Sequence, residues 1–180
     1  VVVVQGGISG SGQLWKLDGT GWWQSLYSVF APADDVQVIS FDYLGGIGGS
    51  DTPDQPLTVA EHAQAYADAL VKLGLTDISA WLGGSFGGVL GLQLAATNKL
   101  IDLKRLAILG AAHKPSIQSA LLRSFQQLLL QHAENEQQGV ILARALAMLT
   151  YRSADEFEQR FSHADDALQY ILAQGERLLR

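Results

Sequence analysis

Short apolar runs rich in β-branched residues alternate with segments of helical periodicity over the first 112 residues of the chain. The apolar runs predict strands at residues 1–5, 36–42, 78–82 and 103–109. Helices are predicted between them, at residues 22–30, at 59–73 and from residue 86 onward. Because strands that alternate with helices favour parallel pairing, the pattern indicates an α/β fold with a central parallel sheet flanked by helices.

Local signals mark the limits of the second predicted helix. Thr58 and Glu61 are placed to form a capping box, in which each side chain accepts a hydrogen bond from the other residue's backbone N–H. Gly74 suits the left-handed position that follows a helix. Residues 51–56 contain two prolines and two aspartates, and we predict a surface loop there.

The pattern changes after Ala112, beyond which no strand is predicted. Apolar residues then fall at helical spacing, as shown by Ile117, Leu121, Phe125, Leu128 and Leu129. A second capping box is predicted at residues 153–156. We therefore predict two parts, an α/β core of residues 1–112 and an all-helical lid or cap of residues 113–180 that is inserted after a strand.

The composition excludes several classes of protein. Among 180 residues there are 12 basic and 18 acidic side chains, which give a formal net charge of −6, and there is no cysteine. The acidic balance argues against nucleic acid as a partner, and the lack of cysteine excludes a disulfide scaffold, a thiolate metal site and a cysteine nucleophile. No apolar run reaches the roughly 20 residues that span a bilayer. We expect no bound metal, no nucleic acid and no membrane partner.

Both ends of the chain predict that it is an internal piece of a longer protein. It opens on the run Val1–Val4 rather than on methionine, and such a run is typical of a buried parallel strand. No signal peptide is visible there. Residues 164–180 are predicted to form a helix with no capping glycine after it.

The sequence Gly83-Gly84-Ser85-Phe86-Gly87 matches the G-x-S-x-G motif of a nucleophile elbow. A predicted strand runs into this motif and a predicted helix runs out of it, as an elbow requires. Glycines are needed because Cβ atoms at the neighbouring motif positions would collide with the strand and the helix. The turn would present the Ser85 hydroxyl at a helix N-terminus, where developing negative charge is stabilised. The alternative is a simple glycine turn without chemistry.

A glycine-rich loop, Gln5-Gly6-Gly7-Ile8-Ser9-Gly10, follows the first predicted strand. Acyl transfer passes through an oxyanion on which two N–H donors must converge. We predict that these donors are the backbone N–H groups of Gly7 and Phe86. The alternative is a phosphate-binding loop of a non-catalytic, Rossmann-like nucleotide-binding domain, with Asp42 as the ribose ligand, although neither a strict G-x-G-x-x-G nor a P-loop sequence is present.

A serine nucleophile also needs a histidine base and an orienting acid, which in α/β-hydrolases follow the serine on loops after later strands. The histidines after Ser85 are His113, His132 and His163. None of them follows two further predicted strands, so we interpret each as a surface or structural residue. We therefore expect the triad aspartate and histidine to lie beyond Arg180 and this chain to be inactive alone.

Several segments, taken in chain order, form a more specific pattern than any one motif. They are Gly21-Trp22-Trp23, Asp42-Tyr43-Leu44-Gly45-Gly46 with Gly49-Ser50, Gly84-Ser85-Phe86-Gly87-Gly88, Ala111-Ala112-His113-Lys114-Pro115, Ala120-Leu121-Leu122-Arg123-Ser124 and Leu149-Thr150-Tyr151-Arg152-Ser153. The set resembles the homoserine O-acyltransferases, enzymes of the α/β-hydrolase fold that make O-acetyl- or O-succinylhomoserine from an acyl-CoA. The match covers nearly the whole chain.

The resemblance implies a role for each site residue. Ser85 would take the acyl group from acyl-CoA, a co-substrate rather than a permanently bound cofactor, and pass it to the hydroxyl of L-homoserine. The N–H groups of Gly7 and Phe86 would hold the oxyanion. Arg152 matches the family's substrate arginine, which grips an amino-acid carboxylate. Its alternative role is an ion pair with an acidic residue of the next helix, Asp155 or Glu156.

The resemblance also implies a cytoplasmic enzyme of methionine biosynthesis and is compatible with a homodimer formed through the helical lid. One departure is the loop Gln5-Gly6-Gly7-Ile8-Ser9, which stands where many members of the family have a His-Ala-Leu-Thr-Gly type sequence. The choice between acetyl and succinyl donors, and between homoserine and serine as acceptor, stays open. Two other functions also remain, a serine hydrolase with water as acceptor and a non-catalytic interaction protein.

Overall fold

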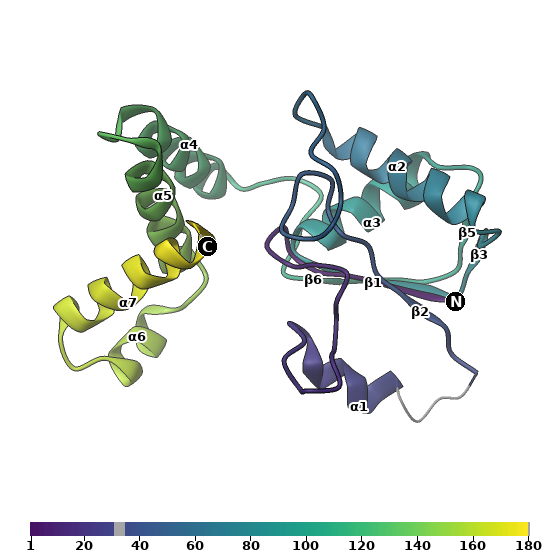
Figure 1. The fold of residues 1–180 in the computed structure, drawn as a ribbon, viewed down its shortest axis with the longest axis horizontal. Coiled ribbons are helices and arrows are strands. Elements are labelled where there is room, and N and C mark those ends of the chain that lie inside the picture. Colours follow the sequence, from purple (N-terminus) through teal and green to yellow (C-terminus); the bar gives the residue numbers. More distant parts are fainter. Residues whose placement is uncertain (31–34, 180) are drawn as a thin grey trace. The chain divides into compact units, whose positions relative to one another are not determined.

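The computed structural model describes residues 1–30 and 35–179 of the chain. The chain divides into two compact units, Val1–His113 and Lys114–Arg180. The first unit combines a sheet with helices, and the second unit is helical in its described residues (Figure 1).

A four-stranded parallel sheet forms the centre of the first unit, with the strand order β2-β1-β4-β6 (Figure 1). Its strands are β1 (Val2–Gln5), β2 (Val38–Ile39), β4 (Ala80–Gly84) and β6 (Leu106–Leu109). In the register, Val3 of β1 lies opposite Ile39 on one side and Trp81 on the other. The predicted parallel sheet is confirmed, and β1 and β4 are its two central strands.

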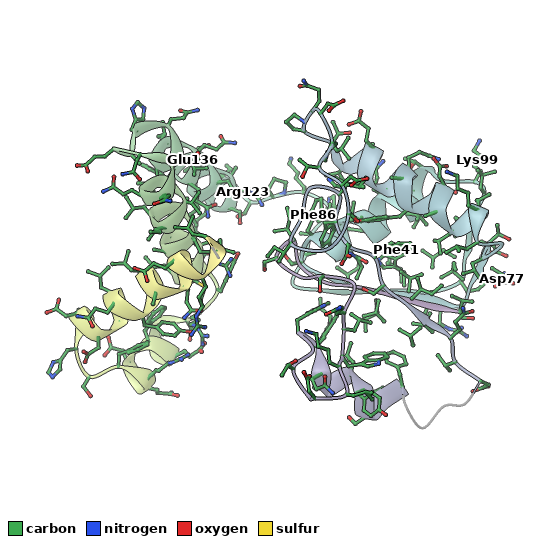
Figure 2. The ribbon with its side chains drawn as sticks, in the orientation of Figure 1. Phe41, Asp77, Phe86, Lys99, Arg123 and Glu136 are labelled. Carbon is green, nitrogen blue, oxygen red and sulfur yellow. The ribbon has the colours of Figure 1, made fainter. Side chains whose placement is uncertain are left out.

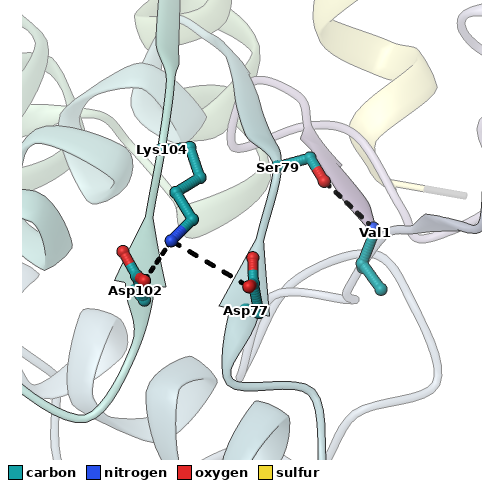
Figure 3. A network of polar contacts seen from close by, with 5 residues as sticks. All are labelled: Val1, Asp77, Ser79, Asp102 and Lys104. Carbon is teal, nitrogen blue, oxygen red and sulfur yellow. Dashed lines mark hydrogen bonds and ion pairs between the residues drawn. The ribbon is translucent and has the colours of Figure 1, made fainter.

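The second sheet, which has only two strands, was not predicted. It pairs β3 (Asp77–Ile78) with β5 (Asp102–Leu103). The side chain of Lys104 contacts the carboxylate of Asp102 and lies 3.9 Å from that of Asp77 (Figure 3). The predictions of unbroken strands at 78–82 and 103–109 are therefore wrong, because each apolar run is interrupted and gives two short strands. The strand predicted at 36–42 is also shorter, since only Val38 and Ile39 pair with β1.

Helices α2 (Val59–Lys72) and α3 (Phe86–Thr97) lie on one side of the main sheet, and α1 (Tyr27–Phe30) lies on the other (Figure 1). A short 3₁₀ turn, η1 (Gln24–Leu26), precedes α1 within the helix predicted at 22–30. The capping box of α2 is present, since Thr58 Oγ1 accepts from the Glu61 N–H at 3.3 Å and Glu61 Oε2 accepts from the Thr58 N–H at 2.7 Å. Gly74 has a φ of 72°, as its predicted left-handed position requires.

The core of the first unit joins the sheet to α2 and α3. Its fully buried members include Trp81 on β4, Leu70 on α2 and Leu90 on α3. The Trp81 indole Nε1 donates a hydrogen bond of 2.9 Å to the carbonyl oxygen of Gly87 in the first turn of α3. This bond and the surrounding apolar contacts fix the start of α3 against the end of β4, where the candidate nucleophile lies.

The second unit contains α4 (Ile117–His132), α5 (Glu136–Thr150), α6 (Ala154–Arg160), α7 (Ala164–Glu176) and the 3₁₀ turn η2 (Arg177–Leu179). The all-helical character predicted after Ala112 is confirmed for the residues that the structure describes. Residue 180, the end of the predicted last helix, lies outside them. None of the described helices is both long enough and apolar enough to cross a membrane.

The cap of α6 differs from the predicted capping box. Ser153 Oγ accepts from the Glu156 N–H at 3.2 Å, as predicted. The Glu156 carboxylate, however, forms an ion pair with Arg152 instead of returning to the Ser153 N–H. The reciprocal half of the box is therefore wrong, because a nearby guanidinium is a better partner for the carboxylate than a neutral N–H.

Candidate active site

Ser85 lies on the tight turn between β4 and α3. Its backbone has φ 51° and ψ −119°, and among the described residues it is the only non-glycine with a positive φ. The Ser85 N–H donates to the carbonyl oxygen of Leu109 at 2.8 Å, which ties the turn to the end of β6. Such a conformation costs about 1–3 kcal/mol and is typical of functional sites. The strand–turn–helix geometry of a nucleophile elbow is thus present at this serine.

The glycines of the motif are required at its two outer positions. A Cβ atom on Gly83 would lie 2.5 Å from the carbonyl oxygen of Gly87, and one on Gly87 would lie 2.6 Å from the carbonyl oxygen of Gly6. Both are backbone atoms that cannot move without shifting a strand or a helix. At Gly84 a Cβ atom would make only an ordinary contact of 3.7 Å with the indole of Trp23. The collision predicted from the sequence is therefore present at Gly83 and Gly87 and absent at Gly84.

The glycine-rich loop after β1 lies against the nucleophile. A Cβ atom on Gly7 would be 3.7 Å from Ser85 Cβ and 4.0 Å from Ser85 Oγ. The Gly87 N–H donates to the Gly6 carbonyl oxygen at 3.0 Å and so fastens this loop to the start of α3. Within residues 1–30 and 35–179, the N–H groups of Gly7 and Phe86 donate to no other group. The role of these two N–H groups as oxyanion donors stays a prediction.

Two polar side chains hold the loop after β1 to the loop after β2. Gln5, which is 1% exposed, donates from Nε2 to the Phe41 carbonyl at 2.9 Å and accepts from the Phe41 N–H at 3.1 Å. The Asp42 carboxylate accepts from the Gly12 N–H at 2.5 Å and from the Gly49 N–H at 2.8 Å. These hydrogen bonds lower the pKa of Asp42, which is therefore ionised at neutral pH. Since both carboxylate oxygens are engaged, Asp42 acts as a loop anchor rather than as a ribose ligand.

An aromatic cluster includes Phe86, the residue that carries one of the two predicted donors. The Phe86 ring, at the start of α3 (labelled in Figure 2), lies 5.4 Å from the Tyr43 ring and 5.7 Å from the His62 ring. The Tyr43 hydroxyl donates to the Gly6 carbonyl oxygen. Burial lowers the pKa of His62, and its Nδ1 has no hydrogen-bond partner within the described residues. Neither Tyr43 nor His62 was predicted from the sequence to lie near the site. Tyr43 belongs to a segment of the family pattern that gave it no role, and His62 belongs to no motif.

No base reaches the nucleophile within the described part of the first unit, where Ser85 Oγ makes no hydrogen bond. His113 is exposed on the loop after β6. In the second unit, His132 ends α4 and His163 precedes α7 without capping it through its side chain. The interpretation of these three histidines as surface or structural residues stays a prediction. The described residues also contain no group of three acidic or histidine side chains that could hold a metal ion.

Arg152 belongs to the second unit, just before α6. Its Nη1 forms an ion pair with Glu156, and its Nη2 lies 3.5 Å from the Tyr170 hydroxyl oxygen. The side chain of Arg152 is 24% exposed. The alternative role weighed from the sequence, an ion pair with an acidic residue of the next helix, is thus present with Glu156. Substrate binding by Arg152 stays a prediction.

Comparison with known proteins identifies relatives of the chain. Residues 1–174 match the family described as alpha/beta hydrolase fold. The chain is 33% identical over 171 residues to the homoserine O-succinyltransferase of Xanthomonas campestris pv. campestris, and this match covers 89% of the chain and 45% of that protein. It is 31% identical over 186 residues to the homoserine O-acetyltransferase of Thermus thermophilus, with coverages of 89% and 48%.

A solved structure of a homoserine O-acetyltransferase is also similar to this chain. The homoserine O-acetyltransferase from Staphylococcus aureus matches with a TM-score of 0.82 at 26% sequence identity, over 98% of this chain and 55% of that one. The chain therefore spans about half the length of the relatives that it matches.

Proposed function

The chain belongs to the alpha/beta hydrolase fold family, and we propose that it supplies the nucleophile and the oxyanion hole of an enzyme that transfers an acyl group from acyl-CoA to L-homoserine. The resemblance to homoserine O-acyltransferases is confirmed by the two curated relatives and by the Staphylococcus aureus structure. Because the chain spans about half of those relatives, we propose the activity for the full-length protein. A role in methionine biosynthesis in the cytoplasm follows from the same proposal.

The observation that carries the proposal is the juxtaposition of Ser85 with the two available N–H groups of Gly7 and Phe86. In the first step Ser85 Oγ would attack the thioester carbonyl carbon of acyl-CoA, and the carbonyl oxygen would become an oxyanion held by both N–H groups. Collapse of this intermediate would break the carbon–sulfur bond and release CoA. The proton of the serine hydroxyl would pass through a histidine base to the CoA sulfur.

In the second step the homoserine hydroxyl would attack the acyl-serine ester. The same base would take the proton of that hydroxyl and return it to Ser85 Oγ as the new ester leaves. We propose that the base and its orienting aspartate come from the remainder of the full-length protein. A hydrolase would use the same nucleophile and oxyanion hole with water as acceptor, so the site geometry alone suits both reactions. Transfer to homoserine is favoured over hydrolysis because the relatives are homoserine O-succinyltransferase and homoserine O-acetyltransferase.

The acceptor is tested by measuring release of CoA thiol from acetyl-CoA or succinyl-CoA by the full-length protein. We expect release to rise saturably with L-homoserine and the O-acylated amino acid to appear in equal amount. L-serine in place of L-homoserine shows which acceptor is preferred. Thiol release that is equally fast without any amino acid would identify a hydrolase, and the absence of release with both donors would contradict the proposed activity.

We also propose that Arg152 binds the carboxylate of the acceptor, in exchange for its ion pair with Glu156. Arg152→Lys keeps the charge but loses the planar fork, so the KM for homoserine should rise about tenfold while that for acyl-CoA changes little. Arg160→Lys is the matched control, since Arg160 lies 4.3 Å above the Tyr170 ring in the same unit. We expect Arg160→Lys to keep the wild-type KM for homoserine. If Arg152→Lys keeps it as well, Arg152 has only its structural role beside Glu156.

A further inference from the structure

Tyr43 is a buried polar residue to which the proposed mechanism gives no role. Its side chain is 2% exposed, and its hydroxyl donates a hydrogen bond to the carbonyl oxygen of Gly6. The same oxygen accepts a second hydrogen bond, of 3.0 Å, from the N–H of Gly87 in the first turn of α3. The Gly6 carbonyl is therefore held from two directions, by the loop after β2 and by the nucleophile elbow.

The Gly6 carbonyl and the Gly7 N–H belong to one peptide group. Because that group is planar and trans, its C=O and N–H bonds point in opposite directions, and fixing one fixes the other. Gly7 borders the nucleophile, since a Cβ atom on it would lie 4.0 Å from Ser85 Oγ. Hydrogen bonds to a carbonyl also polarise the peptide and strengthen its N–H as a donor. Tyr43 thus acts on both the direction and the strength of one oxyanion donor.

The ring of Tyr43 also supports the residue that carries the second donor. It lies 5.4 Å from the Phe86 ring at a tilted angle. Burial raises the pKa of the Tyr43 hydroxyl to about 12, so the group stays protonated and donates throughout the neutral range. Glycines at positions 6 and 7 leave the peptide between them conformationally free, and a rigid aromatic anchor removes that freedom.

We propose that Tyr43 is a positioning residue of the oxyanion hole, which aims the Gly7 N–H at the oxyanion formed on Ser85. This inference rests on the proposed function only in requiring a serine nucleophile at Ser85, whatever the acceptor. It assigns to Tyr43 a role through the Gly6 carbonyl and not through direct contact with substrate.

Tyr43→Phe in the full-length protein tests the inference, since it removes the hydroxyl and keeps the ring on Phe86. We expect the rate of Ser85 acylation, measured as the burst of p-nitrophenol from p-nitrophenyl acetate, to fall about tenfold, a fraction of the loss caused by deleting a donor outright. The concentration of ester that gives half the maximal burst rate should change by less than about twofold, because the ground-state carbonyl depends little on the donor.

Tyr66→Phe is the matched control. Tyr66 is 3% exposed, stacks 4.9 Å from Phe41 and donates from its hydroxyl to the Asp42 carbonyl oxygen at 3.3 Å, which is not part of the Gly6–Gly7 peptide. This variant also removes a tyrosine hydroxyl that donates to a backbone carbonyl, so we expect it to lower stability without slowing acylation. Equal loss of acylation rate in the two variants would overturn the inference and leave Tyr43 with a structural role.

A second measurement does not depend on activity. The amide nitrogen of Gly7 senses the hydrogen bonds to the carbonyl of its own peptide group, so its ¹⁵N resonance should shift in Tyr43→Phe and stay in place in Tyr66→Phe. An unmoved Gly7 resonance in Tyr43→Phe would overturn the inference. If the wild-type protein neither releases p-nitrophenol from the ester nor gains an acetyl group, the proposed serine chemistry fails, and a shift of the Gly7 resonance still supports the control of this peptide by Tyr43.

Discussion

Acyl transfer by the full-length protein is expected to fall by roughly 10⁴-fold or more when Ser85 is replaced by alanine. The elbow places the Ser85 hydroxyl beside the loop of Gly7, and no other hydroxyl of the chain lies on a strand-to-helix turn with φ near 51° in the described residues. Without the hydroxyl no covalent acyl-enzyme can form, and the oxyanion donors alone leave only residual catalysis. Release of CoA in the presence of homoserine is the measurement.

The control for this loss is Ser79→Ala. Ser79 precedes β4 and lies at the end of that strand opposite to Ser85. We expect this variant to keep wild-type turnover. A Ser85→Ala protein that still releases CoA in a homoserine-dependent way would show that the nucleophile is elsewhere.

Replacing Gly87 by alanine should have the second-largest effect, on folding as well as on activity. The added Cβ atom would lie 2.6 Å from the carbonyl carbon of Gln5 and from the carbonyl oxygen of Gly6, and nearer still to the Gln5 oxygen. These atoms belong to central strand β1 and to the loop that carries the oxyanion donor, so relief of the clash must displace one or the other. We expect the free energy of unfolding to fall by about 3 kcal/mol, at the upper end of the range typical of overpacking, because the contacted atoms belong to fixed backbone.

Gly84→Ala provides the comparison within the same motif. Its Cβ atom would make ordinary contacts of 3.7 and 3.9 Å with Trp23, so we expect stability within about 1 kcal/mol of the wild type. Urea denaturation of the full-length variants, followed by tryptophan fluorescence, measures both effects. Equal urea midpoints of unfolding for Gly87→Ala and the wild type would show that the elbow does not need a glycine at this position for steric reasons.

The parts of the site that could be predicted from the sequence are those with local signals. The elbow at Ser85 combines a motif with a strand before it and a helix after it, and the structure has this arrangement. The loop of Gly7 could be placed beside the elbow because parallel neighbouring strands end at the same edge of a sheet. The capping box of α2 is a pattern of two residues three positions apart, which explains why it was also predictable.

The remaining parts depend on contacts between residues far apart in the chain. The Tyr43 hydroxyl reaches a carbonyl 37 positions away, and the Gln5 amide reaches one 36 positions away. Neither contact leaves a periodicity or a motif that a sequence reader can recognise. The interruptions that split two predicted strands are likewise invisible in an apolar run, because β-branched composition reports burial and not the pairing partner.

The central claim is that Ser85 carries the acyl group between the two substrates. The most direct measurement is mass spectrometry of the full-length protein after a single turnover with acetyl-CoA or succinyl-CoA in the absence of an amino acid. We expect a mass gain of one acyl group on the peptide that contains Ser85, and loss of that gain when L-homoserine is added. An unmodified Ser85 peptide under conditions in which CoA is released, or an acyl group on any other residue, would contradict the central claim.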